Sequence, residues 1–148
     1  MDQIEYPSKK IWEIRQKWFE ENLENGQHPL ASYLVSDHST ALLVDLQSCY
    51  CVGAFIPVVI LSVSIIDAQL REIEAGDNKI GTARLLKDYH TGEDVDWLRK
   101  LRNKYVHIDI DNPALSIDHQ YANRKQMEDD ARRAILIVIH AYFQSPGT

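Results

Sequence analysis

Three neighbouring residues have side chains that suit chemistry on a phosphate. Arg102 and Asn103 stand next to each other in the stretch LRKLRNKYVH, and His107 ends it. A guanidinium group stays charged and holds a phosphate through several N–H groups. An imidazole titrates near neutral pH, so it can accept or donate a proton during a reaction. We therefore take Arg102, Asn103 and His107 as the candidate catalytic residues.

A helix that starts near Glu93 and Asp94 and fails by Asp109 is expected to carry these residues. At about 100° per residue, its apolar side chains gather on one stripe, and Arg102 falls at the edge of that stripe. The stripe consists of Leu98, Leu101 and Tyr105. A half-buried guanidinium needs an acceptor, and Asp67 is the acid best placed inside the protein to supply one. Asp67 is therefore the candidate supporting residue.

The spacing of Arg102 and His107 raises a geometric problem. Five residues correspond to about 140° around an ideal helix, so the two side chains do not share a face of one straight segment. Two arrangements would bring them together. Either the helix unwinds at its end, before Ile108, or two copies of the helix meet across a two-fold axis, with Arg102 of one facing His107 of the other.

The element that must position Asp67 is a long apolar segment. We expect one helix from about Ala41 to Glu74, kinked at Pro57 and weakened at Gly53. Its uncharged part, Leu46 to Ile66, reaches the length of a membrane span, but its serines, glycine, proline and acidic flanks favour a helix buried in a bundle. A buried strand over residues 58–66 is the competing interpretation, and the helix-forming residues that follow argue against it.

The remaining periodicity predicts three further elements and one loop. A first helix runs from its cap at Ser8 to near Gly26, a short helix covers Ile80 to Tyr89, and a last helix covers Arg124 to Phe143. The stretch from Ile108 to Tyr121 is expected to be a loop. The sequence thus predicts an all-α bundle of four or five helices, with a long central kinked helix, as one domain over residues 1–148.

Composition limits the classes of function. The formal net charge is −6, which argues against a general electrostatic hold on nucleic acid, so any such site must be local. Lys104, Arg99 and Lys100 are the candidate RNA-binding cations of that site. Cys49 and Cys51 point to different sides of a helix, so we expect neither a metal site nor a disulfide there. The acidic N-terminus is unlike a secretory signal, and the expected location is the cytoplasm.

Taken together, these residues resemble the HEPN superfamily of helical domains. The family's motif has an arginine, a polar residue and, a few residues later, a histidine at the end of one helix, and residues 102–107, RNKYVH, fit it. The segment CYCVGAFIPVVILSVSIIDAQLRE resembles the long apolar helix of these domains, which ends in an acid followed by leucine, here Asp67 and Leu70. The resemblance covers about residues 41–109.

The resemblance implies a homodimer and, in active members, a metal-independent endoribonuclease that needs no cofactor. His107 would act as acid or base, Arg102 would hold the phosphate, and Asn103 would orient the RNA or the histidine. Asp67 would hold Arg102. RNA is then the expected substrate, and an antitoxin or regulator protein is an expected partner of a toxin or antiphage effector.

One departure and one alternative accompany this resemblance. In the toxins of the family that pair with nucleotidyltransferase antitoxins, a tyrosine usually stands two places after the histidine, where this chain has Asp109. Asp109 and Asp111 also repel an RNA backbone. The alternative function is a non-catalytic module for protein or nucleotide binding, in which Arg102 and Asp67 form a fold-stabilising ion pair.

Overall fold

The computed structural model describes residues 5–147, and over this range its regular elements are helices apart from one minimal sheet. This confirms the expected all-α class. The helices are α1 (Lys9–Asn25), α2 (Asp37–Val52), α3 (Phe55–Gln69), α4 (Thr82–Tyr89), α5 (Val95–Val106), α6 (Ile117–Ala122) and α7 (Arg124–Tyr142). A π-helical turn, η1 (Leu70–Ala75), continues α3, and the strands β1 (Ser32–Tyr33) and β2 (Pro146–Gly147) pair antiparallel. Residues 1–4, part of the segment expected not to be a secretory signal, and residue 148 lie outside the described residues.

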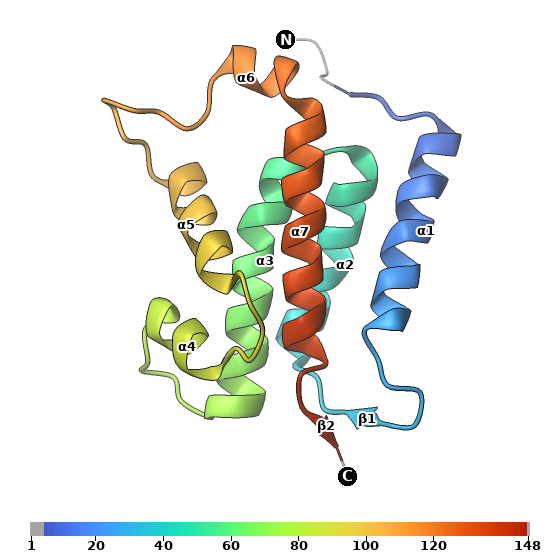
Figure 1. The fold of residues 1–148 in the computed structure, drawn as a ribbon, viewed down its shortest axis with the longest axis vertical. Coiled ribbons are helices and arrows are strands. Elements are labelled where there is room, and N and C mark those ends of the chain that lie inside the picture. The colour runs from blue at the N-terminus through green and yellow to red at the C-terminus, as the bar shows by residue number, and fades with distance from the viewer. Residues whose placement is uncertain (1–4, 148) are drawn as a thin grey trace.

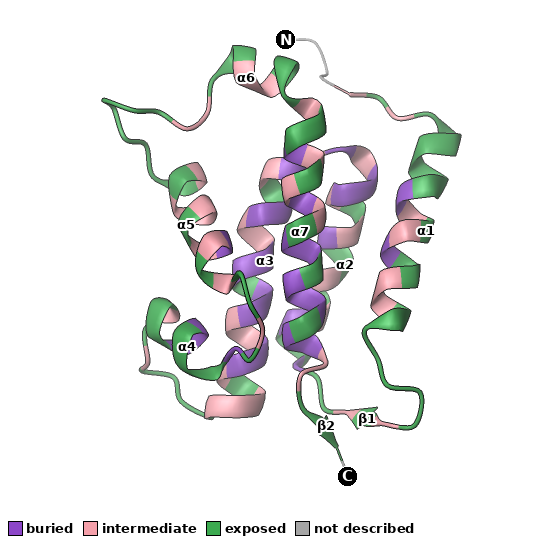
Figure 2. Cartoon of the chain, viewed as in Figure 1, coloured by how far each residue is buried: buried purple, intermediate pink, exposed green. Residues whose placement is uncertain are grey.

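Helix α3 is the centre of the bundle. It packs against α2, α7 and α5, while α1 closes one side against α2 and α7, and α4 and α5 form the other side (Figure 1). The buried residues concentrate on α3 and on the inner face of α7 (Figure 2). The core of α7 includes the four residues that its periodicity predicts, Ala134, Ile135, Val138 and Ile139. One continuous apolar cluster therefore supports every element that borders the candidate site.

The predicted single helix from Ala41 to Glu74 is wrong, because the chain reverses direction at Gly53. Gly53 has a φ of 86°, and its N–H donates to the carbonyl of Tyr50 at 3.1 Å. The N–H of Ala54 donates to the carbonyl of Cys49 at 2.8 Å. This pair of bonds is the Schellman motif that ends many helices. Two antiparallel helices, α2 and α3, therefore replace the expected kinked one (Figure 1).

Pro57 has a different role from the predicted kink. It is the third residue of α3, in the first turn, where backbone N–H groups have no acceptor within the helix. Its missing donor therefore costs no helical hydrogen bond, and its fixed φ suits the start of a helix. The same two residues, Gly53 and Pro57, thus end one helix and begin the next. No helix within residues 5–147 combines the length and apolar character that crossing a bilayer requires.

Several other boundaries agree with the sequence. Ser8 caps α1, its hydroxyl accepting from the N–H of Ile11 at 3.2 Å. Helix α4 covers most of the short helix expected up to Tyr89, and Leu85 and Leu86 are fully buried. The loop expected over residues 108–121 is wrong at its end, because α6 begins there beyond a serine cap at Ser116.

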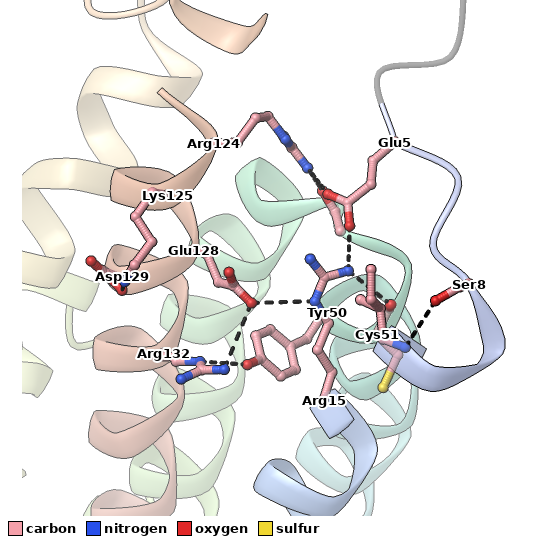
Figure 3. A network of polar contacts seen from close by, with 12 residues as sticks. Glu5, Ser8, Arg15, Tyr50, Cys51, Arg124, Lys125, Glu128, Asp129 and Arg132 are labelled. Atoms are coloured by element: carbon pink, nitrogen blue, oxygen red, sulfur yellow. Dashed lines mark hydrogen bonds and ion pairs between the residues drawn. The ribbon is translucent and has the colours of Figure 1, made fainter. Parts of the chain in front are cut away.

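A network of ion pairs ties the N-terminal segment to α1 and α7. The carboxylate of Glu5 binds Nη1 of Arg15 and Nη2 of Arg124, both at 2.6 Å. Arg15 also binds Glu128 through Nε at 3.3 Å and donates to the carbonyl of Cys51 at 3.2 Å. Figure 3 shows these groups converging where the turn between α2 and α3 meets α1 and α7. Sequence patterns had not singled out any of these charges.

Two glycines give a matched test of this turn. Gly53→Ala is expected to destabilise the fold more than Gly76→Ala, although both glycines have positive φ, 86° and 59°. Each alanine takes on a left-handed backbone, which costs about 1 to 2 kcal/mol. At Gly53 the new Cβ would also overlap the Glu5 carboxylate, whereas at Gly76 nothing lies within 4 Å. Chemical denaturation measures the difference, and equal losses of unfolding free energy would show that Glu5 does not pack against this turn.

Candidate functional site

Helix α5 is held in the bundle by the predicted apolar stripe. Leu98 is completely buried, and Leu101 and Tyr105 pack against the core as partly buried side chains. The helix contacts α3 and α4. Because Arg102 lies one turn beyond Leu98, this packing fixes the guanidinium against α3, as the periodicity predicted.

Arg102 is half-buried and lines a polar hollow of about 310 Å³, to which α2, α3, η1, α4 and α5 contribute side chains. The side chains that share the hollow are mainly polar: His38, Ser64, Asp67, Arg71 and Thr82. The Nε atom of Arg102 is buried and has no hydrogen-bond partner among the described residues. Burying an N–H of a guanidinium without an acceptor is costly, so this atom marks a place where an acceptor is missing.

The expected partner of Arg102 is engaged elsewhere. Asp67 receives two hydrogen bonds from Arg71, from Nε to Oδ1 and from Nη2 to Oδ2, both at 2.9 Å. The hydroxyl of Thr82 donates to Oδ2 at 2.7 Å. The predicted ion pair between Asp67 and Arg102 is therefore replaced by one between Asp67 and Arg71. The physical reason is their spacing of four residues, which places both on one helix face.

The charge of Arg102 still affects the pKa of Asp67. Burial alone would raise the pKa of this carboxyl, but the hydrogen bonds from Arg71 and Thr82 and the charges of Arg71 and Arg102 bring the pKa below its ordinary value. Asp67 is therefore ionised at neutral pH, and Arg102 lies near enough to contribute to that state. Asp67 does belong to the hollow, although it does not hold Arg102 directly.

His107 lies just beyond the helix. Helix α5 ends at Val106, and His107 has extended backbone angles, with a φ of −124°. Its N–H donates to the carbonyl of Asn103 at 3.0 Å. The side chain is exposed and lines a separate hollow of about 190 Å³ with Lys104, Asp109 and Asn112. The helix does unwind before Ile108, but this places His107 and Arg102 in different hollows of one chain.

The other predicted site residues, Asn103 and the three cations, lie in different environments on α5. Lys104 shares the hollow of His107. Asn103 is half-buried, and its backbone carbonyl holds the His107 N–H. Arg99 and Lys100 both bind the carboxylate of Asp96, at 3.0 and 2.9 Å. Of the three predicted RNA-binding cations, Lys104 shares a hollow with His107, whereas Arg99 and Lys100 are paired with an acid.

A larger hollow of about 940 Å³ between α4 and α5 contains neither Arg102 nor His107. It is lined by His90 and by charged side chains of both signs, and most of these charges are already paired. Arg84 binds Asp88 at 3.2 Å, and Arg99 binds Asp96 at 3.0 Å. Size alone is therefore a poor guide to the site, because this hollow offers little uncompensated charge.

No family model, curated protein or solved structure matches the chain. The chemistry of the hollow around Arg102 follows from its own charges. Arg71 and Arg102 face one carboxylate, that of Asp67, so the hollow has a net positive charge. Thr82 and Ser64 add hydroxyl groups. Such a surrounding suits a phosphate group, which carries negative charge and several acceptor oxygens.

Sequence reasoning missed Arg71, which is central to this hollow. Its Nη1 donates to the backbone carbonyls of Asp77 and Ile80 at 3.0 and 2.7 Å. The available signal was the spacing of four residues between Asp67 and Arg71 in a helix, which favours a local ion pair over a distant one. The π-helical hydrogen bond from the Gly76 N–H to the Arg71 carbonyl, at 2.7 Å, was not visible in any pattern.

Proposed function

We propose that this protein is a metal-independent endoribonuclease of the HEPN type, and that its active site forms between two copies of the chain. Arg102 of one copy holds the scissile phosphate, and His107 of the other exchanges protons with the reacting oxygens. Asn103 fixes the backbone at His107, and Lys104 contacts the neighbouring phosphates.

The observation that carries this proposal is the uncompensated guanidinium of Arg102. A structural arginine at a helix edge usually ends on a carboxylate or on carbonyl groups. Here the nearby carboxylate of Asp67 is bound by Arg71 and Thr82, and the buried Nε of Arg102 has no acceptor. A phosphate that enters the hollow would give this guanidinium an acceptor. The alternative function, in which Arg102 only stabilises the fold by pairing with Asp67, lacks the pair that defines it.

The reaction needs only the groups named above. A base removes the proton of a ribose 2′-hydroxyl, whose oxygen attacks the adjacent phosphorus, and the bond to the 5′-oxygen of the next nucleotide breaks. An acid returns a proton to that leaving oxygen, and a 2′,3′-cyclic phosphate and a 5′-hydroxyl result. The guanidinium stabilises the charge that develops on the phosphate oxygens. DNA lacks the attacking hydroxyl, so it is not cleaved.

Two copies are invoked because one chain keeps the two groups apart. Arg102 faces α3 and α4, whereas His107 faces the loop that follows α5. A two-fold axis beside the end of α5 would bring each arginine toward the histidine of the other copy. The apolar side chains of Ile108 and Ile110, 78% and 85% exposed, would then be covered by the partner copy.

The test is cleavage of total RNA in the presence of EDTA by the wild type, by Arg102→Ala, by His107→Ala and by an equimolar mixture of the two variants. Each variant alone is expected to lose at least about 99% of the activity. If the site is shared between copies, the mixture, after dissociation and reassociation, should regain about a quarter of the wild-type rate. Half of the dimers are then mixed, and each mixed dimer has one intact site.

The matched control is Arg84→Ala, which removes an exposed arginine from α4 and should leave cleavage unchanged. If the mixture stays as inactive as its components while sedimentation shows mixed dimers, the shared site is wrong. If the wild type fails to cleave RNA and Arg102→Ala is markedly less stable than Arg84→Ala, the structural role of the motif is favoured instead.

A further inference from the structure

Within residues 5–147, Asp67 supplies the one carboxylate that lines the hollow of Arg102, and Arg71 binds it. Its guanidinium meets both oxygens of Asp67 in a two-bonded arrangement, and Thr82 adds a third bond. Bidentate pairs of this kind are the stronger arginine–carboxylate contacts. The Asp67 side chain is only 22% exposed, so water screens this pair weakly. The negative charge of Asp67 is therefore neutralised by Arg71 and does not pair with Arg102.

Arg71 is itself held from the opposite side. Its Nη1 donates to the carbonyls of Asp77 and Ile80, which belong to the connection between η1 and α4. These bonds fix the plane of the guanidinium, and four of its five N–H groups are engaged. Arg71 is thus a rigid group, while Arg102 in the same hollow has an unpaired Nε. The two arginines have the same charge but different tasks.

We propose that Arg71 is a positioning residue that keeps Arg102 free to bind a phosphate, by holding Asp67 away from it. This inference rests on the proposed function for its link to RNA. Without Arg71, the ionised Asp67 and the nearby Arg102 form their own ion pair, and the hollow loses its positive charge. The arrangement assigns a role to each side chain: Asp67 and Thr82 hold Arg71 in place, and Arg102 is left to the substrate.

The decisive variants are Arg71→Gln and the double variant Arg71→Gln/Asp67→Asn. The probe is a fluorescent oligonucleotide made only of 2′-deoxynucleotides, which the proposed reaction cannot cleave. We expect Arg71→Gln to weaken binding about tenfold, because Asp67 then competes with the phosphate for Arg102. The double variant removes that competitor and should bind within about threefold of the wild type.

Rescue by the second substitution separates this role from a merely structural one. If Arg71 served only to fix the connection between η1 and α4, removing Asp67 as well would leave binding as weak or make it weaker. The control is Arg84→Gln, an exposed arginine with the same four-residue pairing to Asp88, which should change binding less than about twofold.

A second measurement needs no ligand. The Nε–H resonance of Arg102, assigned by its loss in Arg102→Lys, should shift downfield in Arg71→Gln as the group gains Asp67 as an acceptor, and return in the double variant. An unmoved resonance overturns the inference even if binding changes. If the resonance and the binding follow the expected pattern but no variant cleaves RNA, the role of Arg71 stands and the ribonuclease proposal fails.

Discussion

Replacing Arg15 with alanine is expected to lower the free energy of unfolding by about 3 to 5 kcal/mol. The Arg15 side chain is only 8% exposed, and it lies between two carboxylates, those of Glu5 and Glu128. Its removal leaves both acids without their shared cation and leaves the carbonyl of Cys51 without a donor. Glu5 keeps its pair with Arg124, and Glu128 keeps a longer pair with Arg132 at 3.7 Å, so the loss comes from removing the cation that both acids share. Because this cation is buried and makes several bonds, the substitution should exceed most others on α1.

One further contact of Arg15 adds to the expected loss. The Arg15 guanidinium lies 5.3 Å from the ring centre of Phe55, the first residue of α3, and Arg124 stacks on the same ring at 4.7 Å. The desolvation of Arg15 would lower its pKa, but its bonds to Glu5 and Glu128 raise the pKa above the ordinary value. The Arg15 guanidinium is therefore charged at every accessible pH, and it keeps its ion pairs with both acids.

Urea denaturation followed by circular dichroism measures this effect. The control is Lys17→Ala on the same helix, whose side chain is 77% exposed and pairs only with Glu21, and which should change stability by less than about 0.5 kcal/mol. If Arg15→Ala does not fold, Glu128→Gln provides a milder test, because it removes one of the two acids. Losses below about 1 kcal/mol for both variants would contradict the network in Figure 3.

The parts of the fold that could be predicted are those set by local chemistry. The hydroxyl of Ser8 begins α1, and the four inner residues of α7 repeat at helical spacing, so both helices follow from the sequence. The reversal at Gly53 could not be placed in the same way. A glycine and a proline four residues apart are compatible with a kinked helix or with two helices, and only tertiary packing decides between them.

The candidate site shows the same division. The position of Arg102 at the edge of the buried stripe follows from the periodicity of α5, and so does the burial of Leu98. The partner of Asp67 does not follow from the periodicity. Arg71 and Arg102 were both available, and Arg71, which is nearer in sequence, formed the bond. The sequence pattern left the relation between Arg102 and His107 open, and in one chain the two side chains line different hollows. In the function that we propose, their relation depends on which surface a second copy covers.

Truncation of Leu98 is the corresponding test for the helix that carries the motif. Leu98→Ala is expected to lower the free energy of unfolding by about 2 to 5 kcal/mol, because Leu98 is completely buried and the cavity left behind cannot close fully. It is also the only buried residue within α5. The other side chains of this helix that pack on the core are only partly buried and cannot replace it: Val95, Trp97, Leu101 and Tyr105.

Leu98→Ala is also expected to displace Arg102, in addition to lowering the free energy of unfolding. Arg102 reaches its hollow only while α5 is docked on α3. If the protein is the ribonuclease that we propose, Leu98→Ala should reduce cleavage even under conditions where circular dichroism shows a folded protein. Amide hydrogen exchange along α5 should accelerate, because the helix opens locally at a lower free energy. Val106→Ala is the matched control on the same helix, since Val106 is 40% exposed and stands beside His107. If the two variants lose similar stability, α5 is not anchored through Leu98, and Arg102 is not held against Asp67 and Arg71 in the way described.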